Sequence, residues 1–396
     1  MGTTRVLVAG ASIAGPALAH WLRRHGAEVT VVERAPALRP GGQAVDARGV
    51  AREVIRRMGL DAGVRAARTE TAGAHTVAAD GTVLQTQRAD DHGGDGYIAE
   101  IEILRGDLSQ VLYDDTREGV EYLFGDRIAE LTQHADGVDV TFAGGDRRRF
   151  DLVIGADGLH SALRASVFGA HEEFVRHLGL VLAFYSVPNE FGLDRWLLEY
   201  QDPASGRSAL LRPIADATRA MAMFSFPQAD FAVDHRDIDA QKRLLRERVA
   251  DLGWETPRLL AHLDDAPDFY LDQVAQVILP RWSRGRVGLL GDAACSASPM
   301  SGQGTGIALV GAYLLAGELA AAGWDPEVGF VRYEERMRPY VEANQEIGRL
   351  HVASLLPPDP DPNTGPPPEP DMEALTALVE RAINGVELPD YAGVAT

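Results

Sequence analysis

The first part of the chain alternates between short apolar runs and a helical pattern of apolar positions. Residues 5–9 form an apolar run that ends at Gly10, and residues 28–33 form a second run. Between them, residues 14–25 place apolar side chains at the spacing of one helix face, and Gly26 follows. Short apolar runs of this kind are typical of strands in a parallel sheet. The pattern therefore predicts a strand–helix–strand unit.

In the central part of the chain the pattern of apolar and polar positions changes, and it predicts short strands joined by turns. A hairpin is expected over residues 74–86, with its turn at Asp80-Gly81. Further strands are expected at 179–187, 195–200, 207–214 and 218–226, and helices at 237–252 and 305–322. Because turn-rich connections separate these strands, we expect an antiparallel sheet between two α/β segments.

The end of the chain has a different composition. Residues 357–370 contain eight prolines in fourteen positions, which predicts an extended linker, because proline fits neither a helix interior nor a central strand. Residues 371–384 then have the pattern of an amphipathic helix.

Composition and charge limit the classes of binding partner that we expect for this protein. The chain has 58 acidic and 38 basic residues among 396, a formal charge of −20. Nucleic acids and anionic membrane surfaces attract basic patches, so we expect neither as a partner. The longest apolar stretch, Ile307 to Trp324, is interrupted by Glu318, which argues against a membrane span. A single cysteine, Cys295, allows no intramolecular disulfide, and we expect a cytoplasmic protein.

A glycine motif follows the first predicted strand directly. Gly10, Ser12 and Gly15 stand at the glycine positions of G-x-G-x-x-G, with serine in place of the middle glycine. Such a loop opens a helix whose N-terminal amides attract a pyrophosphate, which predicts a dinucleotide site. Glu33 ends the second strand, where a carboxylate accepts hydrogen bonds from a ribose diol and repels an NADP 2′-phosphate. The alternative is a glycine turn that binds no ligand.

Two further strand-to-loop motifs occur later in the chain. Residues 151–164 read as an apolar strand that runs into Gly155 and Asp157 and then into a helix. Residues 286–306 read as another apolar strand that runs into Gly291-Asp292, a proline and a glycine-rich loop. A simple dehydrogenase does not need these two additional motifs.

With the N-terminal fingerprint, these motifs resemble in order those of the class A flavin-dependent aromatic monooxygenases, of the p-hydroxybenzoate hydroxylase type. The resemblance covers about residues 1–350, and the overall length and the stretch Gly41–Asp46 look most similar to the tetracycline-inactivating and polyketide-tailoring members. It implies an α/β fold: a Rossmann-like FAD-binding domain with an inserted antiparallel-sheet substrate domain and a C-terminal helix. The expected segments are 1–72, 97–175 and 281–355 for the FAD domain, 73–96 and 176–280 for the substrate domain, and 356–396 for the linker and helix.

The resemblance also implies the residues that contact the cofactor. Asp292 would accept hydrogen bonds from the ribityl or ribose hydroxyls of FAD, Pro299 would lie beside the isoalloxazine ring, and Arg39 would contact the nicotinamide cofactor. The helix after the glycine-rich loop would direct its N-terminal amides at the flavin pyrimidine. The implied cofactor-binding residues are Gly10, Ser12, Ile13, Ala14, Gly15, Glu33, Arg34, Arg39, Gln43, Asp46, Arg105, Gly155, Asp157, Gly291, Asp292, Pro299, Gly302 and Gly304.

The sequence departs from the family pattern at two positions. Ser12 replaces a glycine, and Cys295 stands where members often carry histidine. For Cys295 we expect a small buried side chain.

Three residues of the central strands are candidates for substrate contact. Arg212 is a candidate anchor for a phenolate, enolate or carboxylate, and the alternative is an exposed or ion-paired arginine. Phe224 and Phe226 share one strand face and would form either the floor of an apolar pocket or part of the core, of which we favour the core.

The family chemistry needs no catalytic protein side chain, because the flavin carries it. NADPH or NADH would reduce the flavin, O2 would add to give a C4a-hydroperoxide, and one oxygen atom would pass to an aromatic or polyketide-like substrate. Alternatives are Baeyer–Villiger oxygenation, a dehydrogenase or halogenase on the same scaffold, or a non-catalytic protein that sequesters flavin or ligand. A halogenase needs a lysine near the flavin, and the single lysine, Lys242, is in a predicted helix of the other domain. We expect a monomer or homodimer without a bound metal.

Overall fold

The structure is a computed structural model that describes residues 2–91, 98–214, 216–230, 234, 237–357 and 371–393. Its first layer is a six-stranded sheet in the order β17-β18-β11-β1-β2-β7. The bounds are β17 Ser283–Arg284, β18 Val287–Leu289, β11 Leu152–Gly155, β1 Arg5–Ala9, β2 Glu28–Glu33 and β7 Glu121–Phe124. All of its neighbouring strands are parallel except β17, which pairs antiparallel with β18. The predicted N-terminal unit is confirmed, with helix α1 at Ala14–Arg24.

The second layer is a seven-stranded sheet in the order β16-β12-β15-β14-β13-β4-β5. The bounds are β16 Tyr270–Val277, β12 Val175–Pro188, β15 Arg219–Pro227, β14 Arg207–Pro213, β13 Trp196–Asp202, β4 Gly73–Val77 and β5 Val83–Arg88. The predicted central strands and the hairpin are confirmed, and the pairs are antiparallel except that of β4 with β13. The hairpin therefore joins the central sheet as its edge.

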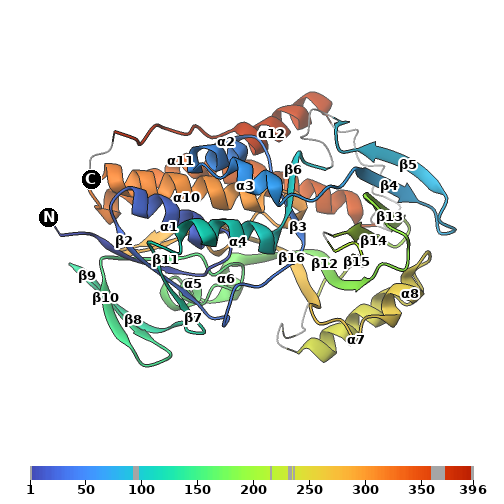
Figure 1. Ribbon diagram of the computed structural model, residues 1–396, viewed down its shortest axis with the longest axis horizontal. Coiled ribbons are helices and arrows are strands. Elements are labelled where there is room, and N and C mark those ends of the chain that lie inside the picture. Colours follow the sequence, from blue (N-terminus) through green and yellow to red (C-terminus); the bar gives the residue numbers. More distant parts are fainter. Residues whose placement is uncertain are drawn as a thin grey trace, which may run out of the picture.

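Helices cover one face of this second sheet. Helix α7 (Ile238–Val249) and helix α8 (Thr256–Ala261) pack against β12, β14 and β15 and enclose a separate apolar core. Figure 1 shows these two helices on the outer side of the sheet, at the end of the molecule away from α1. The opposite face of the sheet remains directed toward the first layer.

Helix α10 (Gly304–Ala321) is the central helix of the larger core. By length and composition alone it is apolar enough to cross a membrane, but 89% of these 18 residues are buried inside the protein. Helix α1 and the long helix α11 (Pro326–Leu355) pack against it (Figure 1). The apolar character of α10 is therefore accounted for by protein packing.

Smaller elements complete the two layers. A three-stranded sheet consists of β8 (Ile128–His134), β9 (Gly137–Phe142) and β10 (Arg147–Phe150), and a ribbon pairs β3 (Ala44–Ala47) with β6 (Ile101–Leu104). The remaining helices are α2 Val50–Met58, α3 Asp61–Ala66, α4 Arg105–Thr116, α5 Ala162–Val167, α6 His171–Phe174, α9 Asp292–Cys295 and the 3-10 helix η2 Pro299–Ser301.

The C-terminal helix packs against the long helix α11 of the larger core. Helix α12 spans Met372–Asn384, as predicted, and Asn344 donates a hydrogen bond from its side-chain nitrogen to the carbonyl of Ala382 over 2.9 Å. In Figure 1, α12 lies beside α2. Residues 358–370, most of the predicted proline linker, are outside the described residues. The predicted domain limits remain a proposal, which the division into two sheets and two cores supports.

Candidate active site

One large cavity lies between the two layers. It has a volume of about 1320 Å³ and is lined by the loops after β1, β2, β11 and β18 and by side chains of β12, β14, β15 and β16. Ligands of open α/β sheets bind outside the carboxyl ends of the strands, which is where these loops meet. Typical small-molecule sites have about 300–1,000 Å³, so this cavity is large enough for two ligands side by side.

The loop after β1 depends on glycine for its packing. Gly10 has φ +110°, and a Cβ there would lie 2.4 Å from the carbonyl oxygen of Ala156. A Cβ on Gly15 would lie 1.9 Å from the carbonyl oxygen of Gly10. These two glycines thus let β1, α1 and the loop after β11 approach one another. The residues between them, Ala11 to Ala14, line the cavity.

The N-terminus of α1 is directed at this cavity. Ile13 is the cap residue and forms no side-chain cap hydrogen bond, and no acidic residue occupies the first turn. Within the described part of the chain, the amides at this end are therefore available to an anionic group, which the helix dipole also favours. The side chain of Ser12 lies near that of Ser109, with 3.5 Å between their hydroxyl oxygens.

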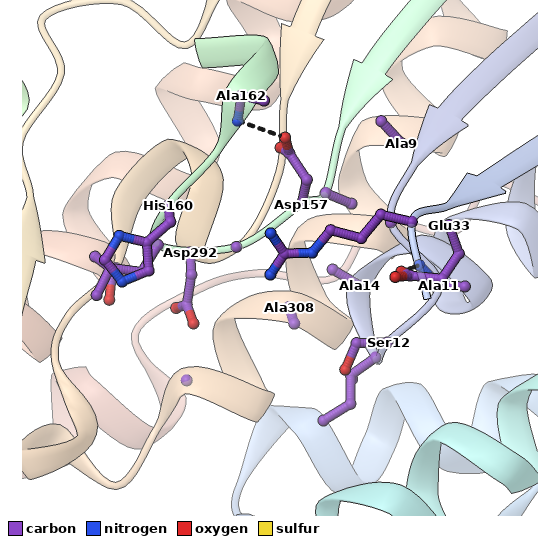
Figure 2. Close-up of a pocket in the computed structure, with 18 of the residues that line it drawn as sticks. Ala9, Ala11, Ser12, Ala14, Glu33, Asp157, His160, Ala162, Asp292 and Ala308 are labelled. Carbon is purple, nitrogen blue, oxygen red and sulfur yellow. Dashed lines mark hydrogen bonds between the residues drawn. The ribbon is translucent and has the colours of Figure 1, made fainter. Parts of the chain in front are cut away.

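Glu33 has a structural role that the sequence motif did not reveal. Its carboxylate accepts hydrogen bonds from the amides of Ala11, over 2.9 Å, and Ala35, over 2.8 Å. Figure 2 shows Glu33 beside Ala11 at one end of the cavity. The carboxylate therefore joins the loops after β1 and β2. Because a carboxylate has about four acceptor positions, it retains acceptor capacity for the predicted ribose hydroxyls.

The segment from Arg39 to Asp46 packs on the start of α4. The amide of Arg105 donates to the carbonyl of Gln43 over 3.0 Å, and the amide of Gly106 donates to that of Gly41 over 2.8 Å. Arg39, Gln43, Asp46 and Arg105 all line the cavity, as does Arg34. The structure thus brings together five predicted cofactor residues from two distant segments.

Asp157 accepts hydrogen bonds from the start of the short helix α5 as well as lining the cavity. Its carboxylate accepts hydrogen bonds from the amides of Ala162, over 2.8 Å, and Leu163, over 3.2 Å (Figure 2). Buried Arg164 donates to the carbonyl of Ala293 over 2.9 Å, which joins this motif to α9. Burial lowers the pKa of Arg164, while Asp157 and Asp292 act in the opposite direction.

Asp292 is open to the cavity but otherwise surrounded by protein. This enclosure raises the pKa of its carboxyl group, and nearby Arg105 partly opposes the effect. In Figure 2, Asp292 lies on the far side of Asp157 from Glu33. A carboxylate at this place can accept hydrogen bonds from hydroxyl groups of a ligand in the cavity.

The start of α10 forms the next part of the wall. Pro299, Gly302 and Gly304 line the cavity, and a Cβ on Gly302 or Gly304 would meet no described atom within 4 Å. The cap residue Gln303 makes no side-chain cap hydrogen bond, and the first turn holds no acidic residue. The N-terminal amides of α10 therefore face open space, where they can stabilise a bound anionic ring system.

Three of the predicted cofactor residues lie behind the wall of the cavity. Gly15 packs on Gly10, a Cβ on Gly155 would lie 2.7 Å from Leu289, and a Cβ on Gly291 would lie 3.3 Å from that of Ala14. Their contribution is close packing of the loops. Their assignment to the cofactor site remains a proposal, in which these three glycines act through the packing of the loops.

An apolar wall forms the other side of the cavity. Leu182, Phe184, Met223 and Tyr270 line it, and the rings of Phe184 and Tyr270 are stacked with their centroids 4.8 Å apart. Phe224 and Phe226 were candidates for substrate contact, and this expectation was wrong. Both are 1% exposed and belong to the core under α7 and α8. The favoured interpretation, that they belong to the core, is confirmed.

Arg212 lines the cavity but is ion-paired. Its guanidinium lies 2.7 Å from the carboxylate of Glu102, which also accepts hydrogen bonds from Thr69 and Thr71. Burial acts to raise the pKa of Glu102, but Arg212 and the two hydroxyls outweigh it and hold the pKa below its usual range. The interpretation of Arg212 as an ion-paired arginine is confirmed, and its role as a substrate anchor remains a proposal.

A histidine–carboxylate pair at the cavity was missed by the sequence analysis. The Nε2 atom of His160 lies 2.7 Å from the carboxylate of Asp272, which also accepts a hydrogen bond from Tyr270 over 3.1 Å. His160 belongs to the motif 151–164, and Asp272 lies on β16 of the second sheet. The position of His160 within a cofactor motif was the available signal, but its partner is 112 residues away.

The single cysteine and the single lysine of the sequence lie outside the cavity lining. Cys295 is 1% exposed and its thiol is 3.6 Å from the carbonyl oxygen of Gly291, which confirms the expected buried side chain. Lys242 lies on α7 and donates to the carbonyl of Asp264 over 3.0 Å. The single lysine is thus held on the outer side of the second sheet.

Comparisons with known proteins agree with this geometry. The family described as FAD binding domain matches residues 3–346. An uncharacterized protein of Mycobacterium tuberculosis (strain H37Rv) is 44% identical over 387 residues, which cover 98% of this chain and 99% of that protein. A flavin-dependent monooxygenase from an unknown prokaryotic organism is 40% identical over 391 residues, which cover 98% of this chain and 99% of that protein. The crystal structure of tetracycline destructase Tet(55) is similar with a TM-score of 0.86 and 38% identity, over 98% of this chain and 99% of that one.

Proposed function

The chain belongs to the FAD-binding-domain family and is an FAD-dependent monooxygenase, and we propose that it uses NADPH or NADH and O2 to insert one oxygen atom into an aromatic or polyketide-like small molecule. The observation that carries this proposal is the continuity of one cavity. It extends from Glu33 and the start of α1 to the apolar wall at Phe184 and Met223. A dinucleotide and a second, apolar ligand therefore share one enclosure.

The residues present fit FAD. The uncapped amides of α1 are suited to the pyrophosphate, Glu33 to ribose hydroxyls, and Asp292 to the ribityl or ribose hydroxyls. The amides of α10 and the open space beside Gly302 and Gly304 are suited to the pyrimidine edge of the ring system, with Pro299 beside it. When bound, FAD supplies the redox chemistry, accepting electrons from the nicotinamide and activating O2.

The protein itself binds, orients and excludes water. The α10 amides stabilise negative charge on a reduced ring, and Arg105 faces the same region from the start of α4. The apolar side chains Leu182, Phe184 and Met223 exclude water from the substrate side, which strengthens electrostatic interactions there. No described side chain needs to act as a nucleophile.

We propose a planar, electron-rich polycyclic substrate with phenol or enol groups. The stacked rings of Phe184 and Tyr270 at the cavity offer an aromatic surface for such a molecule. The similarity to a tetracycline destructase makes tetracycline-type polyketides the first class to examine. Arg212, already balanced by Glu102, is suited to a neutral or weakly acidic oxygen rather than to a full carboxylate.

The test is a screen of polycyclic phenols and tetracyclines with purified protein. We expect a yellow protein, NAD(P)H oxidation stimulated by substrate, matching O2 uptake, and a product heavier by one oxygen atom. A product with an intact carbon ring supports hydroxylation, and oxygen within a former carbon–carbon bond supports the Baeyer–Villiger alternative. Flavin without oxygen-dependent NAD(P)H oxidation for any substrate would instead support a sequestering protein.

The location of the lysine bears on the halogenase alternative. Lys242 lies on α7 under the second sheet, while the cavity is on the opposite face of that sheet. This placement favours oxygenation over halogenation. We further propose that the protein acts in the cytoplasm as a monomer or homodimer, with the buried α10 as part of its core.

A further inference from the structure

The backbone immediately before α10 contains a strained residue at the cavity. Ser298 has φ +78° and ψ 155°, a conformation that residues with a side chain rarely adopt. Such conformations persist only where the surrounding structure holds them, and they cluster at functional sites. Ser298, Pro299 and Met300 all line the cavity. The contacts that hold this loop therefore bear on the cofactor site.

Two buried glutamines donate to the loop from behind. Gln276 on β16 is 1% exposed, and its Nε2 donates to the carbonyls of Ala297, over 3.1 Å, and Gln345, over 2.7 Å. Gln345 on α11 donates from its own Nε2 to the carbonyls of Val277, over 3.0 Å, and Ser296, over 3.4 Å. Buried carbonyls need such donors, so the two carboxamides fix the backbone before Ser298.

Helix α11 adds two further contacts at a spacing of three residues. A Cβ on Gly348 would lie 2.4 Å from the carbonyl oxygen of Ala297, so only glycine lets the helix approach the loop this closely. His351 donates from Nδ1 to the carbonyl of Met300 over 2.9 Å. Gln345, Gly348 and His351 thus form one face of α11 that lies against the loop.

We infer that Gln276, Gln345 and Gly348, here called the loop clamp, are positioning residues of the FAD site. They hold residues 296–302 in the strained form that presents Pro299 and the amides of α10 to the cavity. The three clamp residues act only through the loop, because residues of the loop line the cavity and the clamp residues do not. The inference rests on the FAD site and is independent of which substrate the enzyme oxidises.

Releasing the loop clamp has two expected consequences for the cofactor. The α10 amides stabilise the negative charge that the flavin acquires on reduction. A displaced loop directs them less well, so FAD binds more weakly and its reduction potential falls. Both quantities are measured without substrate turnover.

The experiment compares Gln345→Leu and Gly348→Ala with the wild-type holoenzyme. Leucine removes the two donated hydrogen bonds at similar volume, and alanine pushes on Ala297 from the helix side. For each variant we expect the FAD dissociation constant to rise about tenfold, the effect of losing one well-formed buried interaction. We also expect a lower flavin reduction potential in both.

Matched control variants distinguish an effect on the position of the loop from an effect on the overall stability of the protein. Gln241 on α7 is also 1% exposed and donates to a backbone carbonyl, that of Asp234, over 3.0 Å, but in the other core. A Cβ on Gly63 of α3 would have only an ordinary contact, 3.7 Å from Val111. Gln241→Leu and Gly63→Ala are expected to keep the wild-type dissociation constant and potential, whatever their melting temperatures.

The proposal is overturned if Gln345→Leu and Gly348→Ala bind FAD with wild-type affinity and potential. A fall in melting temperature alone, as in Gln241→Leu, would mean that the clamp is merely structural. Should Gln345→Leu fail to fold, Gly348→Ala decides by itself. Alanine stabilises a helix relative to glycine, so that variant retains a folded α11 while displacing the loop.

Discussion

The side chains of His160 and Asp272 join the two layers of the protein across the cavity, with 2.7 Å between Nε2 and the carboxylate oxygen. His160 comes from the motif after β11, and Asp272 from the strand β16. The Asp272 side chain is 8% exposed and the His160 side chain 29%, so the carboxylate side of this contact is shielded from water. The pair therefore couples the position of a cofactor loop to the substrate sheet.

Asp272→Ala is expected to destabilise the protein by about 1.5–3 kcal/mol, because it removes the charged acceptor of a partly shielded hydrogen bond. The matched control is Asp139→Ala, which removes exposed contacts of Asp139 with His134, at 2.9 Å, and with Arg149, at 3.0 Å. That change should cost less than about 1 kcal/mol. Denaturant unfolding of both variants measures the difference, and equal losses would contradict the assigned coupling.

Asp292→Asn is expected to weaken FAD binding while stabilising the protein without cofactor. The pKa of Asp292 is raised in the folded state, so the charged form opposes folding at neutral pH. The stability gained by the variant should be largest at neutral pH and disappear as pH falls and the wild-type carboxyl group becomes protonated. Melting curves of the apo-proteins from about pH 3 to pH 8, a window that includes the ordinary Asp pKa of about 3.9, test this. A variant less stable than wild type at neutral pH would contradict it.

Arg212→Leu is expected to destabilise the protein by about 3–5 kcal/mol, because it removes the charged partner of the buried carboxylate of Glu102. Replacing both Arg212 and Glu102 by leucine should cost less than either single change. The lowered pKa of Glu102 means that this pair stabilises the fold above the ordinary titration range of Glu, and that the contribution is lost as pH falls. Urea unfolding of the three variants completes the cycle, and additive losses would speak against the pair.

Gly15→Ala and Gly304→Ala are expected to affect different properties, the first the stability of the protein without cofactor and the second the affinity for FAD. A Cβ on Gly15 would lie 1.9 Å from Gly10, so this change should lower the melting temperature of the protein without cofactor. A Cβ on Gly304 meets no described atom within 4 Å, so the apo-protein should melt as the wild type does. In that variant only FAD binding should weaken, which flavin fluorescence measures. Similar melting losses for both changes would refute the distinction.

The sequence predicts the parallel strands and loops of the cofactor side well, because each feature is local. Apolar runs that end in glycine mark β1, β11 and β18, and the residues after them reach the cavity. The same reasoning did not separate contact from packing. Gly155 and Gly291 occupy motif positions, but the structure shows that they accommodate neighbouring side chains.

The features that were missed depend on contacts between distant segments. Nothing near Gln276 in the sequence indicates that it meets Ala297 and Gln345, since Ala297 lies in the loop before α10 and Gln345 lies in α11. The pairing of Arg212 with Glu102 likewise joins residues 110 positions apart. For Phe224 and Phe226, alternation defined a shared face, but only the position of α7 and α8 shows which side of the sheet that face is on.

The order of strands in the first sheet has a consequence for biosynthesis. Strand β1 pairs with β11, and β11 pairs with β18, although these strands begin at Arg5, Leu152 and Val287. Pairings between distant segments form late, because the intervening chain must be ordered first. While the ribosome is still making the substrate sheet, the N-terminal unit has its loops but lacks Asp292 and α10. FAD can therefore be enclosed only after Asp292 and α10 have been made, and the unpaired edge of β11 is exposed until then to chaperones and to other chains.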